Sequence, residues 1–359
     1  MQTPWGDLER LDLTDTVLAE RILSGDKHQL VEGLIVESLF DQFVENIPNH
    51  VPSILPLDIE TIIVDRGRDP DRWLAVVWAR SKTEGLGRFL AALESRFTVF
   101  LIEFEPGVGF AGARIIDGKR AASRISLDEL LRPFATTKHT PFKVDASVRD
   151  ADRQRKAIWG FLLDRYGTGL ASGVLLPRLL INCGVQPWFR AVWNLDRIFI
   201  ADGVPWLFEV KHKFPFGPSP LKFGINNGEL KVLGLLAECG SKVLFSIMVK
   251  PRWSKTISSL YMLNDLTARD RTAIVGLALD ADRIARIMGR ISGKSGADTT
   301  ITGAGRGLAY KPIPVTNFGM CGVFSDKPAS IAEKLVGEMR GIPSPRTTEQ
   351  TLQSLRLPV

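Results

Sequence analysis

Two acidic residues and a lysine near the middle of the chain have the types and spacing that a divalent-metal site needs. Asp196 precedes Glu209-Val210-Lys211 within the segment WNLDRIFIADGVPWLFEVKHKFPF. Carboxylates and a backbone carbonyl, here that of Val210, are oxygen ligands that suit Mg²⁺ or Mn²⁺. Lys211 would hold an attacking water or offset the negative charge that develops on a phosphodiester. The pattern therefore predicts Asp196, Glu209 and Lys211 as catalytic residues, with Asp196, Glu209 and Val210 as metal ligands.

A tight hairpin is expected to bring the two acids together. The dipeptide Asp202-Gly203 supplies the positive φ angles of a two-residue turn between strand-like segments at Leu195–Ala201 and Val204–Lys211. Counting outward from this turn places Asp196 opposite Glu209. The two carboxylates are therefore predicted to share one patch of a β-ribbon.

The alternation of side chains along the second strand separates the charged residues into two sets. Glu209, Lys211 and Lys213 are predicted to project from one face, because successive side chains of a strand point to opposite sides. His212 is predicted to point away from the acids and to have a structural role.

The pattern Asp196…Glu209-Val210-Lys211 resembles the D…ExK signature of the PD-(D/E)XK nuclease superfamily. The resemblance covers about residues 150–250 and rests on the motif together with its hairpin, the helix near 228–238 and the strand that follows. It implies a restriction-endonuclease-like fold, with a central mixed sheet flanked by helices, Mg²⁺ dependence and cleavage of DNA, less often RNA. A Mg²⁺-dependent endonuclease, a hydrolase of DNA phosphodiester bonds, is the predicted function.

Several further side chains are predicted to contact nucleic acid. Members of the superfamily often place a polar residue early in the helix after the ExK strand, and Glu229 or Lys231 occupies that region. The full predicted set is Arg190, Arg197, Lys213, Glu229 and Lys231. Two basic clusters at helical spacing, Arg153/Arg155/Lys156 and Arg283/Arg286/Arg290, would either grip a phosphate backbone or form solvated helix faces.

A third acidic ligand is not evident from the sequence. The helical segment Leu170–Asn182 contains no acid, and Asp164 lies one helix earlier. The alternative function is therefore a catalytically inactive nuclease-fold module that binds nucleic acid or a partner in a larger complex. A weaker alternative is an interaction protein with no nucleic-acid role.

The elements that must position these residues can be predicted from hydrophobic periodicity and turn signals. Thr14–Ile47 is predicted to form two helices interrupted near Gly25. Strands are expected at Thr61–Val64, Trp73–Trp78, Val99–Phe104, Pro187–Trp193, Lys242–Val249 and Thr272–Leu279, and further helices at Gly87–Arg96, Ala151–Tyr166, Leu170–Asn182, Gly228–Glu238 and Asp280–Met288.

The stretch Pro133–Asp150 loses this periodicity, which predicts a domain boundary. The prediction is an N-terminal α/β domain at 1–140 that selects substrate or partner, a nuclease-like domain at 150–340, and a polar tail at 341–359 that need not be ordered. The order of elements in the first part faintly repeats that of the second. Either a decayed duplicate or a generic α/β domain would account for this.

Composition is compatible with these predictions but does not require them. The formal charge of +6 tolerates a polyanion such as DNA, and three widely separated cysteines favour a reducing compartment. The basic-then-apolar start of a signal peptide and any run of about eighteen apolar residues are both absent from the sequence. A cytoplasmic protein without membrane contact is predicted. A homodimer, or a larger defence or mobile-element complex, is left open.

Overall fold

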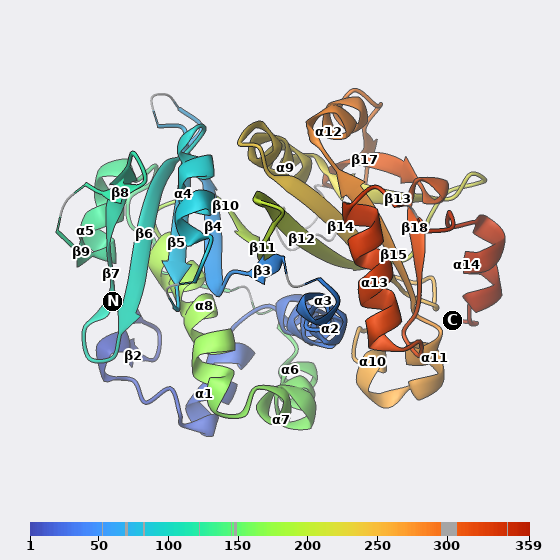
Figure 1. Cartoon of the computed structure of the whole chain (residues 1–359). Coiled ribbons are helices and arrows are strands. Elements are labelled where there is room, and N and C mark those ends of the chain that lie inside the picture. Colours follow the sequence, from blue (N-terminus) through green and yellow to red (C-terminus); the bar gives the residue numbers. More distant parts are fainter. Residues whose placement is uncertain are drawn as a thin grey trace. The chain divides into compact units, whose positions relative to one another are not determined.

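The computed structural model describes residues 1–51, 53–68, 71–81, 83–121, 123–144, 146, 149–295, 307–342 and 344–359. The protein is mixed α/β and divides into two compact units. Unit 1 comprises Met1–His28 and Leu55–Pro205, and unit 2 comprises Gln29–Ile54 and Trp206–Val359 (Figure 1). The chain therefore passes between the units three times.

These units divide the chain at different places from the boundary expected at Pro133–Asp150. Residues 150–205 group with the first sheet because β10 (Ala191–Leu195) pairs antiparallel with β4 (Ile59–Asp65). Residues 29–54 group instead with the C-terminal part of the chain. Local periodicity does not reveal such long-range pairings.

Unit 1 is built on one mixed sheet with the strand order β10-β4-β5-β6-β7-β8. The apolar strand β5 (Trp73–Ala79) runs parallel to β6 (Thr98–Glu105), and the helix α4 (Leu86–Glu94) connects them. The sheet continues through β7 (Gly109–Ile116), β8 (Lys119–Arg120) and β9 (Ile125–Ser126), and a separate pair is formed by β1 (Gln2–Thr3) and β2 (Gly6–Asp7). Every residue of β5 is buried, as expected for a strand covered on both faces.

The other helices of unit 1 are α1 (Thr16–Ser24), α5 (Leu127–Leu131), α6 (Ala151–Ala157), α7 (Leu163–Tyr166) and α8 (Leu176–Leu179). All of them except α5 lie within segments that the sequence predicts to be helical. Wider π-helical turns at Ile158–Leu162, Ala171–Leu175 and Leu180–Val185 extend α6, α7 and α8 into two helical stretches. Pro177 stands near the start of α8, so it interrupts the second stretch without ending it.

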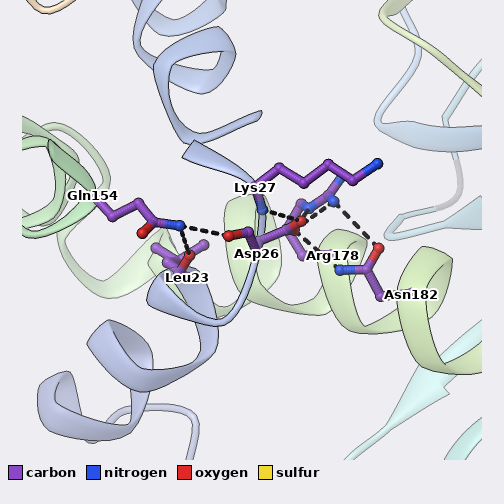
Figure 2. A network of polar contacts seen from close by, with 6 residues as sticks. All are labelled: Leu23, Asp26, Lys27, Gln154, Arg178 and Asn182. Carbon is purple, nitrogen blue, oxygen red and sulfur yellow. Dashed lines mark hydrogen bonds and ion pairs between the residues drawn. The ribbon is translucent and has the colours of Figure 1, made fainter. Parts of the chain in front are cut away.

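A buried polar network fastens the end of α1 to the second helical stretch (Figure 2). The Asp26 side chain is only 4% exposed and accepts hydrogen bonds from Arg178 at 2.8 and 2.5 Å and from Asn182 at 3.0 Å. The Gln154 amide donates to the backbone carbonyls of Leu23 and Asp26 at 3.2 and 2.6 Å. Each buried charge thus has a direct partner, as burial requires.

Unit 2 contains the strand order β18-β15-β14-β12. The strand β12 (Val204–Lys213) runs parallel to β14 (Lys242–Val249), and α9 (Asn227–Glu238) connects them. The strands β15 (Ala273–Leu279) and β18 (Gly319–Val323) complete this order, and β13 (Lys222–Asn226), β17 (Ala309–Pro314) and β16 (Gly293–Lys294) form a small second sheet. The helices are α2 (His28–Val44), α3 (Ile47–His50), α10 (Tyr261–Asn264), α11 (Leu266–Asp270), α12 (Ala281–Met288), α13 (Pro328–Met339) and α14 (Glu349–Leu355).

The two units repeat one connectivity. In unit 1, β5, α4, the parallel strand β6 and the antiparallel strand β7 follow one another. In unit 2, β12, α9, the parallel strand β14 and the antiparallel strand β15 occur in the same order, with β13 between β12 and α9 and two short helices between β14 and β15. A duplicated origin of the two units stays a prediction.

The C-terminal segment, predicted to be a polar tail that need not be ordered, has defined structure. It contains α14, and the backbone amides of Met320, Thr347 and Leu357 link it to the rest of unit 2 through bonds of 2.8, 2.9 and 2.9 Å to Pro345, Phe318 and Pro251. The Leu352 side chain is 2% exposed. Composition alone misjudged this segment because backbone hydrogen bonds, not an apolar face, hold most of it.

Candidate functional site

The turn that precedes the site has the predicted geometry. Asp202 and Gly203 adopt positive φ values of 48° and 81°, as both central residues of a type I′ turn require. The turn joins β11 (Arg197–Ala201) to β12. The prediction of a tight Asp-Gly reversal is therefore confirmed.

Asp196 does not lie within a strand, in contrast to the predicted segment Leu195–Ala201. Leu195 ends β10 and pairs with Thr61 of β4, and Arg197 begins β11, so Asp196 occupies the break between them. The reason is that the chain leaves the unit 1 sheet at this point. Asp196 belongs to unit 1 and Glu209 to unit 2, so the proximity of their carboxylates stays a prediction.

Within unit 2, three charged side chains converge between β12 and the first turn of α9. The Lys211 ammonium contacts the Glu209 carboxylate directly, and it lies 3.4 Å from Oε1 of Glu229. The three side chains are 28%, 6% and 13% exposed, respectively. We call Glu209, Lys211 and Glu229 the acidic cluster.

Glu229 stands in the first turn of α9 beside the two strand residues. The positive end of the helix dipole favours a carboxylate there. The sequence indicated only that Glu229 lies early in a helix. The packing of α9 beside β12 shows that its side chain faces Lys211. Contact between Glu229 and nucleic acid stays a prediction.

Opposing effects act on the pKa of Glu229. Burial raises it, but the attraction of Lys211 and Lys213 and a hydrogen bond with the Glu209 carboxyl group outweigh burial, so the pKa lies below its ordinary value. Glu229 is therefore ionised at neutral pH. The Glu229 carboxylate is a negative charge that Lys211 and Lys213 compensate.

Lys213 extends the same strand face but is engaged within the fold. Its ammonium donates a 2.7 Å hydrogen bond to the Gly224 carbonyl and lies 5.7 Å from the centre of the Phe245 ring. Burial lowers its pKa, and Lys211 lowers it further, while Glu229 and Glu209 raise it. This placement makes Lys213 a support for the acidic cluster, and its predicted contact with nucleic acid stays untested.

A divalent cation fits part of this arrangement. Oε1 of Glu229 is buried and has the Lys211 ammonium 3.4 Å away as its ion-pair partner, but no hydrogen bond to it is formed by the described residues, so it has an acceptor position to spare. Two adjacent carboxylates are hard oxygen donors of the kind that Mg²⁺ prefers. However, across the described part of the chain, no three His, Cys, Asp or Glu side chains are grouped as a complete metal site. Glu209 and Glu229 would therefore need a further ligand.

The other predicted metal ligands and nucleic-acid-binding residues lie in β12, on another side of α9, or in unit 1. Val210 pairs with Ser246 in the β12–β14 ladder, and its carbonyl as a ligand stays a prediction. Lys231 is two residues beyond Glu229, about 200° around the helix, so it lies on another side of α9. The residues Asp164, Arg190 and Arg197 belong to unit 1.

The two basic clusters are partly neutralised by neighbours. Arg153 pairs with Asp150 at 3.0 Å, and Arg155 pairs with Glu20 at 2.9 Å. In the second cluster, Arg283 and Arg290 donate to the backbone carbonyls of Ala278 and Pro312 at 2.6 and 3.0 Å. These contacts favour helix-surface stabilisation for most members of both clusters.

His212 points to the opposite face of β12 and joins a buried polar network, as predicted. Its Nδ1 lies 3.0 Å from the Ser259 hydroxyl, and its Nε2 lies 2.8 Å from the Tyr261 hydroxyl. The Ser259 amide donates in turn to Glu32 of α2 at 2.7 Å. Burial, with repulsion from Lys250, holds the pKa of His212 well below its ordinary value.

This environment predicts that unit 2 loses stability in mild acid. Between the ordinary pKa of about 6.5 and the lower folded pKa, the unfolded chain binds a proton at His212 that the folded chain does not. The free energy of unfolding should therefore fall as pH decreases below about 6.5, by up to about 1.4 kcal/mol per pH unit from this group. Urea unfolding between pH 8 and pH 5 measures the slope. A His212→Gln variant should have a smaller slope, whereas His139→Gln, at an exposed position, should not.

Comparison of the chain with protein-family models, with curated proteins and with solved structures yields no significant match. Among the described residues, no individual helix has the length and apolar composition needed to cross a bilayer, and one bent pair, 151–169 with 171–185, meets those criteria only when its halves are combined.

Proposed function

We propose that the protein is a Mg²⁺- or Mn²⁺-dependent endonuclease of the restriction-endonuclease-like type that hydrolyses phosphodiester bonds of DNA. The observation that carries this proposal is the convergence of Glu209 and Glu229 with Lys211 in contact with both. The order of β12, α9 and the parallel strand β14 around them supports it. Asp196 is proposed as a further ligand.

Each residue of the acidic cluster has a distinct role in this proposal. A bound divalent ion would polarise the scissile phosphate and supply a coordinated water. Glu209 and Glu229 bind the ion, and their burial on β12 and α9 fixes its position. Lys211 orients the attacking water or neutralises charge that develops on the phosphate oxygens. Its contact with two carboxylates fixes its positive charge beside the proposed ion site, which favours the second of these roles.

The alternative proposal is an inactive nuclease-fold module that binds DNA. It is favoured by the incomplete ligand set among the described residues and by the Lys211 ammonium, which already compensates both carboxylates. Such a protein would bind DNA with a strong dependence on salt and no dependence on EDTA, without cleaving it.

A plasmid-nicking assay separates the two proposals. The full chain should convert supercoiled plasmid to the nicked form with Mg²⁺ or Mn²⁺, and EDTA should abolish the reaction. Lys211→Ala should reduce the rate by about 100- to 1,000-fold, because it removes one preorganised charge from the transition state. Lys255→Ala, which changes an exposed lysine of unit 2, is the matched control. Equal rates for the wild type and Lys211→Ala would contradict the endonuclease proposal.

A further inference from the structure

A cavity in unit 1 combines positive charge with aromatic surface. It has a volume of about 570 Å³ and lies among the N-terminal segment, α1, α6, residues 142–144 and Arg149. Ligand pockets commonly have volumes of about 300–1,000 Å³, so this cavity has room for a small molecule or one unit of a polymer. All of its lining residues belong to unit 1.

The cavity wall carries more positive than negative charge. Arg21, Lys143, Arg149 and Arg155 line it, and among the described lining residues Glu20 is the one that carries a carboxylate. Glu20 is already engaged, because it pairs with Arg155 at 2.9 Å and accepts a 2.8 Å hydrogen bond from the Trp159 indole. Among the described residues, no carboxylate pairs with Arg21, Lys143 or Arg149. Three exposed cations in one concave site attract an anion with several oxygen atoms.

The same wall presents flat apolar groups and an unsatisfied hydroxyl. Trp5 and Phe142 line the cavity and are both half-buried. The Trp5 ring packs so closely over Gly25 that a Cβ atom there would lie 2.7 Å from it, which fixes the ring against α1. The Ser24 hydroxyl, also on the wall, is buried and has no hydrogen-bond partner within the part of the chain that the structure describes.

From this combination we propose that the cavity is a nucleotide-binding site. Arg21, Lys143 and Arg149 bind the phosphate, and the base stacks on Trp5 or Phe142, since aromatic stacking accepts any base. The same chemistry is offered by a free nucleotide and by the terminal nucleotide of a nucleic-acid strand. The proposal does not depend on the endonuclease proposal, because none of the cavity residues belongs to the acidic cluster.

Isothermal titration calorimetry of the full chain in EDTA tests this site without interference from metal-dependent cleavage. The titrants are AMP, a short 5′-phosphorylated oligothymidylate, adenosine and inorganic phosphate. AMP or the oligothymidylate should bind more tightly than adenosine or phosphate alone, and added salt should weaken binding. Preference for the oligothymidylate would identify the strand end as the ligand, and preference for AMP the free nucleotide.

Substitutions localise the binding. Arg21→Gln and Lys143→Gln should each weaken it by about tenfold, because each removes a charge-assisted contact with phosphate. Trp5→Leu should weaken binding of the nucleotide by about tenfold but leave the affinity for inorganic phosphate unchanged. Lys119→Gln, at an exposed lysine of β8, is the matched control and should bind like the wild type.

Three results would overturn the proposal: neither nucleotide probe binds, inorganic phosphate binds as tightly as both of them, or Lys143→Gln and Lys119→Gln have equal effects. Circular dichroism of each variant, compared with the wild type, ensures that a loss of binding is not a loss of fold.

Discussion

Glu209→Gln is expected to reduce the rate of metal-dependent DNA cleavage by at least about 1,000-fold. The nicking rate of this variant should also rise less steeply with Mg²⁺ concentration than that of the wild type. The Glu209 carboxylate is 6% exposed and contacts both Lys211 and Glu229, so an amide there would remove a buried negative charge from the centre of the acidic cluster. Loss of a ligand that positions a catalytic ion commonly has effects of this order. The nicking rate as a function of Mg²⁺ concentration measures both changes.

Two further variants, one in the acidic cluster and one outside it, serve as comparisons for Glu209→Gln. Glu229→Gln should shift the Mg²⁺ concentration needed for half-maximal rate upward, because it removes the second carboxylate of the cluster. Glu333→Gln, which changes an exposed acid of α13, should leave the nicking rate and its dependence on Mg²⁺ concentration unchanged. If Glu209→Gln cleaves as fast as the wild type, Glu209 binds no catalytic ion and the endonuclease proposal fails.

Asp26→Asn is expected to destabilise unit 1 by about 3–5 kcal/mol, because it leaves a buried guanidinium without its counter-charge. The side chain of Arg178 is 14% exposed, and its ion pair in the structure is with Asp26. The midpoint of thermal unfolding should fall by about 6–20 °C. Differential scanning calorimetry measures the shift.

Asp152→Asn is the matched control, since that carboxylate is 84% exposed and lies in α6 of the same unit. Surface ion pairs contribute about 0–1 kcal/mol, so this variant should unfold within about 4 °C of the wild type. A double variant, Asp26→Leu with Arg178→Met, should recover part of the loss, because it removes both buried charges together. Equal midpoints for Asp26→Asn and the wild type would show that the network in Figure 2 contributes little to stability.

The elements with strong local signals could be predicted from the sequence. Lys242–Val249 forms β14 with the predicted ends, and α9 differs by one residue at its start. The Asp202-Gly203 turn also forms as predicted, because its backbone conformation is specified by those two residues. In such segments the local preference and the tertiary structure agree.

The features that depend on distant partners could not be predicted. Asp196 breaks a predicted strand because Leu195 pairs with Thr61, far away in the sequence. The C-terminal segment is ordered by amides that bond to neighbouring segments of unit 2, which composition does not report. The division into units has the same origin, since residues 29–54 pack with segments that follow Trp206.

The candidate site shows the same limit. Alternation along β12 correctly separated Glu209 and Lys211 from His212, because it depends only on strand geometry. It could not show that Glu229 completes the cluster or that Lys213 is held by the Gly224 carbonyl. Those contacts depend on how α9 and β13 pack beside the strand.

The interleaved course of the chain has a consequence for its synthesis on the ribosome. The helix α2 contains Val31, Ile35, Phe40 and Phe43 as core residues of unit 2, yet it emerges well before β12, β14 and β15. Until the C-terminal half has been translated, these side chains have no permanent neighbours, and the nascent polypeptide exposes them. Fragments ending near Pro205 should therefore aggregate or recruit chaperones, so expression of either half alone is a poor route to an isolated folding unit.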